Sequence, residues 1–161
     1  MACYFPHRRC APALLIVFAL AIQGQNLRGK VTRVIDGDTI EVLLNSSPIT
    51  VRLNGIDAPE SGQMFGSRAK QICSELSFGK FVGLVLLNRE RYNRIVADVI
   101  LPDGRNLSQE LVRGGAAWWF RRYAPHDEKL RLLEEDARDS KRGLWADENP
   151  MPPWEFRKLS K

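Results

Sequence analysis

The chain has 161 residues, of which 44% are hydrophobic and 27% are charged, and its formal net charge is +5. This length fits one packed domain and leaves little room for a second, so we expect one core and one site. The mild positive charge favours a polyanionic partner without identifying one, because many slightly basic small proteins bind no nucleic acid.

The first two dozen residues have the pattern of a secretory signal peptide. Two arginines at 8–9 precede the apolar run 11–22, which is short for a membrane-spanning helix, and an A-x-A site ends at Ala21. We predict that residues 1–24 are a signal peptide, cleaved between Ala21 and Gly24, and that the protein is periplasmic or secreted. The alternative is an uncleaved membrane anchor.

Cysteine usage agrees with export of a domain without disulfides. Cys3 and Cys10 lie in the predicted signal, so Cys73 alone would remain in the mature chain. Cys73 shares a helical face with Ala69 and Leu76, which predicts a small buried side chain rather than a reactive thiol.

Five segments have the composition and alternation of β-strands, and turn residues such as Asp36-Gly37 separate them. They are 30–35, 39–44, 47–56, 80–87 and 94–101. Three further segments have the helical period: 65–78, 108–115 and 126–143. Gly79 is expected to end the first helix and Ser108 to cap the second.

This order of elements predicts a mainly β, α+β domain over residues 25–146: a closed or nearly closed barrel of five strands with about three α-helices. A sheet of so few strands must protect its edge strands from pairing with other chains, which favours closure into a barrel. The tail 147–161 is rich in proline and charge, and its Trp154 and Phe156 are expected to dock on the domain.

Acidic residues gather at the ends of two neighbouring strand patterns. Asp38 shares a strand face with Ile40, so its carboxylate ends an apolar stripe and needs a partner. Asp57 and Glu60 follow the next pattern, where an antiparallel strand would return toward Asp38. Three hard oxygen donors there suit Ca²⁺, with Mg²⁺ as an alternative that demands tighter geometry. Taken singly, each acid also fits an ordinary turn.

Two arginines accompany these carboxylates. Arg52 lies in the strand before Asp57, and Arg94 begins a later strand. Forked guanidinium groups bracket phosphate oxygens, so arginines beside a cation site fit phosphodiester hydrolysis by an activated water. The alternative for either arginine is an ordinary surface ion pair.

The motifs that carry these residues resemble those of the staphylococcal nuclease family. The similar stretches are VIDGDTIEV, VRLNGIDAPE, ERYNRIVADVIL, LVRGGAAW and SKRGLW, which run in the family's order from about Gly29 to Trp145. The resemblance implies an OB-fold barrel of five strands with three helices. It also implies a Ca²⁺-dependent endonuclease that acts on DNA and RNA.

The resemblance also implies roles for individual residues. Asp38 and Asp57, with the backbone carbonyl of Ala58, match the Ca²⁺ ligands, and Asp36 matches an acid close to the metal. Ala58 replaces a hydroxyl residue of the best-known member, which matters little because the ligand is the carbonyl.

The catalytic positions are also matched. Glu60 matches the proposed general base, a role still debated in the family. Arg52 and Arg94 match the phosphate-binding arginines, and the expected product end is a 3′-phosphate.

The substrate surface departs more from the family. Arg91, Tyr92 and Tyr123 match a cation and two aromatics that surround the nucleotide, and stacking of bases on them predicts a preference for single-stranded or fraying substrate. Asn93 replaces a common glycine.

The run 118–122, WWFRR, is rich in aromatics and arginine. At least one tryptophan of this run should be in the core. Its arginines either extend a phosphate track or are solvated charges.

The competing interpretation is a catalytically inactive OB-fold that binds nucleic acid. Such domains typically lose the carboxylates or arginines, and this chain keeps them, so we favour the nuclease. No stable protein partner is implied, and a monomer is expected.

Overall fold

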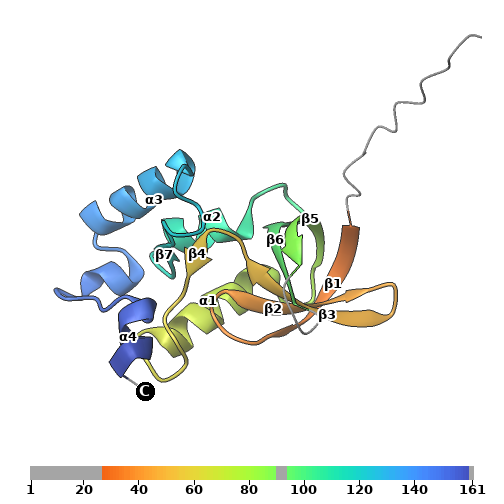
Figure 1. Cartoon of the computed structure of the whole chain (residues 1–161), viewed down its shortest axis with the longest axis horizontal. Helices are drawn as coiled ribbons and strands as arrows, with labels where there is room; N and C mark the ends of the chain where they lie inside the picture. The colour runs from red at the N-terminus through yellow and green to blue at the C-terminus, as the bar shows by residue number, and fades with distance from the viewer. Residues whose placement is uncertain (1–26, 90–93, 160–161) are drawn as a thin grey trace, which may run out of the picture.

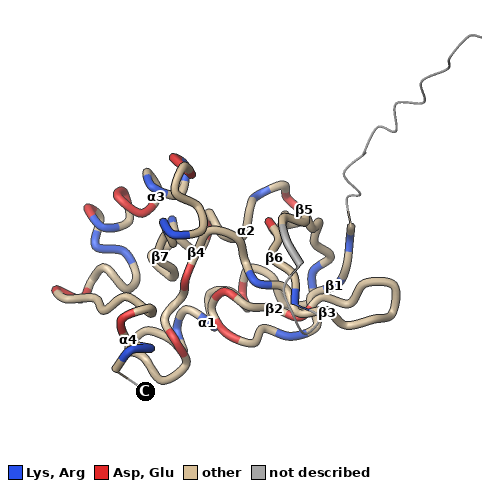
Figure 2. The backbone as a smooth tube through the Cα atoms, in the orientation of Figure 1, with Lys and Arg blue, Asp and Glu red and all other residues tan. Residues whose placement is uncertain are grey.

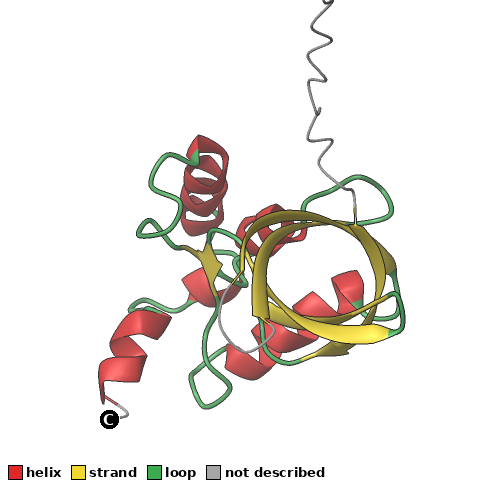
Figure 3. Cartoon of the chain, turned by 45° about the vertical axis from the view of Figure 1, so that its right-hand side comes forward, coloured by secondary structure: helices red, strands yellow, loops and turns green. Residues whose placement is uncertain are grey.

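The computed structural model describes residues 27–89 and 94–159. Its centre is a closed barrel of five strands (Figure 3) in the order β1-β2-β3-β6-β5. The strands are β1 (Leu27–Val34), β2 (Thr39–Leu44), β3 (Ser47–Leu53), β5 (Phe81–Arg89) and β6 (Arg94–Ile100). All neighbours are antiparallel except β3 and β6, which are parallel. This mixed barrel confirms the predicted fold class.

The predicted strand 47–56 is wrong at its end. The chain turns at Gly55, whose φ of 73° favours glycine, and leaves the barrel. Residues Ile56–Asp57 form β4, which pairs antiparallel with β7 (Trp118–Trp119) in a separate two-stranded sheet. The turn therefore moves Asp57 out of the barrel wall and onto a short ribbon beside the barrel rim.

The described residues form four α-helices rather than about three (Figure 1). They are α1 (Gly66–Ser77), α2 (Leu107–Arg113), α3 (Glu128–Asp139) and α4 (Pro153–Leu159), with a 3₁₀ turn, η1 (Gly143–Ala146). The additional helix, α4, lies in the predicted tail and begins at a proline, the residue best suited to a first helical position.

The N-cap of α2 is Asn106 and not Ser108, because the Asn106 side chain accepts the Gln109 N–H at 3.3 Å. The helix therefore begins before the serine that was expected to cap it. Asparagine is as good a cap as serine.

Aliphatic side chains fill the barrel and extend to α1. Val31, Ile40, Val42, Val51 and Val99 are fully buried. Ala69 and Cys73 carry this core onto α1, and burial raises the pKa of the Cys73 thiol to about 12. Cys73 is thus a core side chain, as predicted, and its thiol stays protonated at neutral pH.

A cluster of aromatic rings holds the C-terminal segment against the domain. Trp118 lies edge-on to Trp145 with ring centroids 4.3 Å apart and edge-on to Trp154 of α4 at 5.5 Å. Trp154 also stacks on Phe120 at 5.4 Å. Both Trp118 and Trp119 are buried, which satisfies the expectation that at least one would be.

No helix within the described ranges has the length and apolar character needed to cross a membrane.

Candidate active site

Charged residues from four segments meet at one rim of the barrel, beside α4. In Figure 2 acidic stretches follow the chain from β4 toward α1, and the basic end of α4 lies next to them. Asp38 precedes β2, Arg52 lies in β3 opposite Thr39, and Asp57 lies in β4. The antiparallel pairing of β2 with β3 brings Asp38 beside Arg52, whereas Asp57 reaches them from β4, which pairs with β7.

Arg52 joins two buried carboxylates. Its Nη1 forms an ion pair with Asp38, and its Nη2 lies 2.8 Å from Oδ1 of Asp57. Asp38 and Asp57 are 2% and 0% exposed, whereas the Arg52 side chain keeps 24% of its surface accessible. Burial would lower the pKa of Arg52, but Asp38 and Asp57 raise it overall. The guanidinium is therefore permanently charged and reaches solvent at one edge.

Asp38 is fixed by backbone and hydroxyl donors. Its Oδ2 accepts the Ala58 N–H at 2.6 Å, and its Oδ1 accepts the Thr39 hydroxyl at 3.0 Å. Asp36 accepts the Asp38 N–H at 3.1 Å and so shapes the turn before β2. Burial raises the pKa of Asp38 to about 7 against the opposing effect of Arg52. This carboxylate is thus short of compensating positive charge.

Glycine permits the close approach that aligns Asp38 with Ala58. A Cβ at Gly37 would lie 2.6 Å from the Ala58 Cβ and 3.0 Å from that of Ala69. Any larger residue would push the turn away from the segment that follows β4. The hydrogen bond from the Ala58 N–H to Asp38 therefore depends on the close packing of Gly37 against Ala58.

Glu60 lies on the segment between β4 and α1, whose backbone is closely held. Its N–H donates to Oε1 of Gln63 at 3.2 Å, and its carbonyl accepts the Gln63 N–H at 2.8 Å. A Cβ at Gly66 would lie 1.9 Å from the Glu60 carbonyl oxygen, so α1 begins directly against this segment. The Glu60 side chain itself remains 36% exposed. The arrangement gives an accessible carboxylate on a fixed backbone.

Arg157 of α4 is a site residue that the sequence analysis missed. Its Nη2 lies 2.7 Å from Oδ2 of Asp57, and its Nη1 lies 2.5 Å from Oε1 of Glu60. The hydrogen bond to Asp57, with the one to Glu60, raises the pKa of Arg157 further. The contacts span about a hundred residues of sequence, which no local pattern signals.

The remaining predicted site residues are more dispersed. Arg94 begins β6 in parallel register with Thr50, two residues before Arg52 on β3. Arg94 and Arg52 therefore lie on the same outer face of neighbouring strands. Tyr123 is 72% exposed, with its ring edge-on to Phe120 at 4.9 Å. The predicted residues Arg91 and Tyr92 lie outside the described residues.

The oxygen atoms at the rim are of the chemical type that binds a hard cation. Two buried carboxylates and the nearby Ala58 carbonyl are the ligands that Ca²⁺ prefers. Within residues 27–89 and 94–159, no three His, Cys, Asp or Glu side chains are grouped closely enough to hold a metal ion. The Arg52 and Arg157 guanidinium groups lie against the same carboxylates, so a cation must share or replace these contacts.

Comparison with known proteins gives the family. A model of staphylococcal nuclease homologues matches residues 50–147. The chain belongs to the staphylococcal nuclease family. An uncharacterized endonuclease of Escherichia coli is 41% identical over 150 residues, 93% of this chain and 97% of its own length.

More distant members extend the comparison. A micrococcal nuclease of Shigella flexneri is 39% identical over 162 residues, 95% of this chain and 93% of its own. A staphylococcal-like nuclease of Arabidopsis thaliana is 34% identical over 128 residues, 78% of this chain and 38% of its own.

In this family member Arg157 lies beyond the stretch that matches the family model, and it contacts two of the expected functional residues. Replacing Arg157 with alanine should tighten Ca²⁺ binding about 10-fold, because a cation would no longer compete with the Arg157 guanidinium for Asp57, to which it donates two of its three hydrogen bonds. Calorimetric titration with Ca²⁺ measures this change. Lys158→Ala, which removes the same charge one residue further along α4, is the matched control and should change the affinity less than about 3-fold. Equal affinities of wild type and Arg157→Ala would contradict the competition.

Proposed function

We propose that this member of the staphylococcal nuclease family is an exported, Ca²⁺-dependent endonuclease that hydrolyses phosphodiester bonds of DNA and RNA. The proposal rests on the arrangement of charged side chains at the barrel rim. Two nearly inaccessible carboxylates share one partly exposed arginine, and an accessible glutamate lies within reach of the same group of charges. The endonuclease relatives, similar over more than nine tenths of the chain, support the same conclusion. Export rests on the sequence pattern of residues 1–24.

The two arginines bind the scissile phosphate in this proposal. Arg52 is held in place by Asp38 and Asp57 and presents its accessible edge to the substrate. Arg94, on the same face of the next strand, approaches the phosphate from a second side and assists departure of the 5′ oxygen. Guanidinium groups fixed before the reaction stabilise charge that develops on the phosphate oxygens.

Glu60 orients the attacking water and accepts its proton. Its side chain is accessible, while its backbone is fixed by Gln63 and by the start of α1. Ca²⁺ held by Asp38, Asp57 and the Ala58 carbonyl would neutralise phosphate charge and lower the barrier to attack. Cleavage of the 5′ oxygen bond leaves a 3′-phosphate end.

The expected substrate is single-stranded or fraying nucleic acid. Tyr123 offers an exposed ring near the aromatic run, and a base must leave its helical stack before it can lie on such a ring. Heat-denatured DNA should therefore be cut faster than intact duplex. A preference for intact duplex would contradict this part of the proposal.

The test uses the chain from Gln25 onward with heat-denatured DNA in Ca²⁺, in Mg²⁺ and in chelator. Cleavage should require Ca²⁺, and the products should be primers that a polymerase extends only after phosphatase treatment. Extension without phosphatase would contradict the 3′-phosphate assignment. DNA binding without cleavage under any metal would instead support the non-catalytic binding module.

A further inference from the structure

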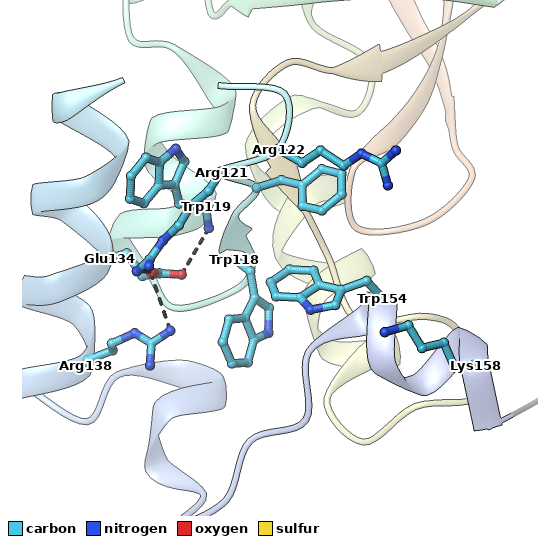
Figure 4. A pocket seen from close by; sticks show the side chains of 9 residues that line it. Trp118, Trp119, Arg121, Arg122, Glu134, Arg138, Trp154 and Lys158 are labelled. Carbon is cyan, nitrogen blue, oxygen red and sulfur yellow. Dashed lines mark hydrogen bonds and ion pairs between the residues drawn. The ribbon is translucent and has the colours of Figure 1, made fainter. Parts of the chain in front are cut away.

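We propose that a cavity between α3 and α4 binds a second nucleotide of the single-stranded substrate, beyond the bond that is cleaved. The proposal rests on the proposed function for the identity of the ligand. The cavity has a volume of about 510 Å³, and it is lined by residues 118–122 with side chains from both helices (Figure 4). Arg52, Glu60, Arg94 and Tyr123, assigned above to the cleavage centre and its nucleotide, do not line it.

Aromatic rings form one wall of the cavity. Trp154 stacks on Phe120 with an interplanar angle of 24°, and Trp118 lies edge-on to Trp154. Unstacked nucleobases bind to such rings with little dependence on sequence. The cavity therefore offers a flat apolar platform of the kind that a base requires.

Trp118 adds a hydrogen-bond donor that lacks a partner. Its indole Nε1 is buried and meets no acceptor among the described residues. Buried indole N–H groups usually have a partner, so this one needs explanation. Trp118 lines the cavity, so a shift of its ring would bring this N–H to a ligand that carries acceptor atoms in its ring, as a nucleobase does.

Positive charge surrounds the platform. Arg122 and Lys158 lie on either side of Trp154 (Figure 4) and form no ion pair with any described residue. Arg138 also lines the cavity but is already engaged, because it lies 3.4 Å from the buried Glu134 and over the Trp118 ring. Two available cations beside stacked rings match the alternation of phosphate and base in a single strand.

Helix α4 places the cavity beside the cleavage centre. Trp154 and Arg157 are three residues apart, which puts their Cβ atoms about 5–6 Å apart on the helix surface. Trp154 lines the cavity while Arg157 contacts Glu60 at 2.5 Å. A strand whose phosphate lies at Arg52 can thus extend along α4 without leaving the protein.

The test compares single-stranded oligothymidylates of about two and about eight nucleotides, because the shorter one cannot fill both places. Binding is measured in chelator with wild type, Trp154→Ala and Trp154→Phe. Trp154→Ala should weaken binding of the longer oligonucleotide about 10-fold and that of the shorter one less than about 2-fold, and phenylalanine should restore most of the loss.

A second pair of variants tests the charges. Lys158→Ala should lower the dependence of binding on salt by about one phosphate contact. Arg113→Ala, which removes an exposed arginine of α2 that pairs with Glu110, should leave the salt dependence unchanged. Equal salt dependence of the two variants would overturn the phosphate contact.

The outcomes separate this proposal from the proposed function. Equal losses for both oligonucleotides in Trp154→Ala would assign Trp154 to stability alone, and no loss would mean that the cavity is unused; either result overturns the proposal. Absence of cleavage under every metal would overturn the proposed function. The binding of the short and long oligonucleotides would still test whether the cavity holds a nucleotide.

Discussion

Replacing Arg52 with alanine is expected to lower the free energy of unfolding by about 2–5 kcal/mol in metal-free buffer, the cost of removing one partner from a buried ion pair. Asp57 would keep Arg157, but Asp38 would lose its only cationic partner in the described structure. A buried carboxylate without such a partner is costly. Denaturant unfolding in chelator measures the loss.

A matched control and a rescue make this prediction sharper. Arg33→Ala removes an arginine from an exposed pair with Glu41 and should cost less than about 1 kcal/mol. Added Ca²⁺ should recover part of the loss in Arg52→Ala, because a bound cation supplies the missing positive charge beside Asp38. Cleavage should stay slow even then, since the guanidinium that we propose binds the phosphate is gone. Equal costs for the two arginines would contradict the buried charge cluster.

Replacing Glu60 with glutamine is expected to slow DNA cleavage by about two to four orders of magnitude, the usual contribution of a positioned general base. The substitution preserves size but removes the negative charge, and with it the ability to accept a proton and the ion pair with Arg157. Because the contact of Glu60 with Arg157 is partly exposed, unfolding should shift by less than about 1 kcal/mol. Single-turnover rates at saturating Ca²⁺, beside a thermal unfolding curve, measure both effects.

The control for Glu60→Gln is Glu75→Gln on the exposed side of α1, which should cut at the wild-type rate. Glu75 contacts Gln71 and Arg68 and lies outside the rim. A rate for Glu60→Gln within about 10-fold of wild type would show that another group accepts the proton.

The barrel could be predicted from sequence because its signals are local. Alternation of apolar and polar residues marks each strand, and turn residues separate them. The same alternation placed Asp38 on the buried face, and antiparallel pairing of β2 with β3 then brought Arg52 beside it. The Asp38–Arg52 part of the site therefore follows from nearest-neighbour strands.

The remainder of the site depends on contacts between distant parts of the chain. The separation of β4 from β3 depends on pairing with Trp118–Trp119, some sixty residues later. The sequence predicts that Trp154 docks on the domain but not where, because α4 is too short for its amphipathic pattern to indicate a partner. Arg157 reaches Asp57 and Glu60 only because that docking occurs.

The most direct test of the rim as a cation-dependent hydrolytic site is the rate of cleavage of a single-stranded oligonucleotide as a function of free Ca²⁺. Wild type should show a saturable dependence with no cleavage in chelator. Asp57→Asn should need far more Ca²⁺, whereas Asp103→Asn, at an exposed turn where the carboxylate pairs with Arg105, should match wild type. Cleavage in chelator at the wild-type rate, or the same Ca²⁺ dependence in Asp57→Asn, would contradict the assignment.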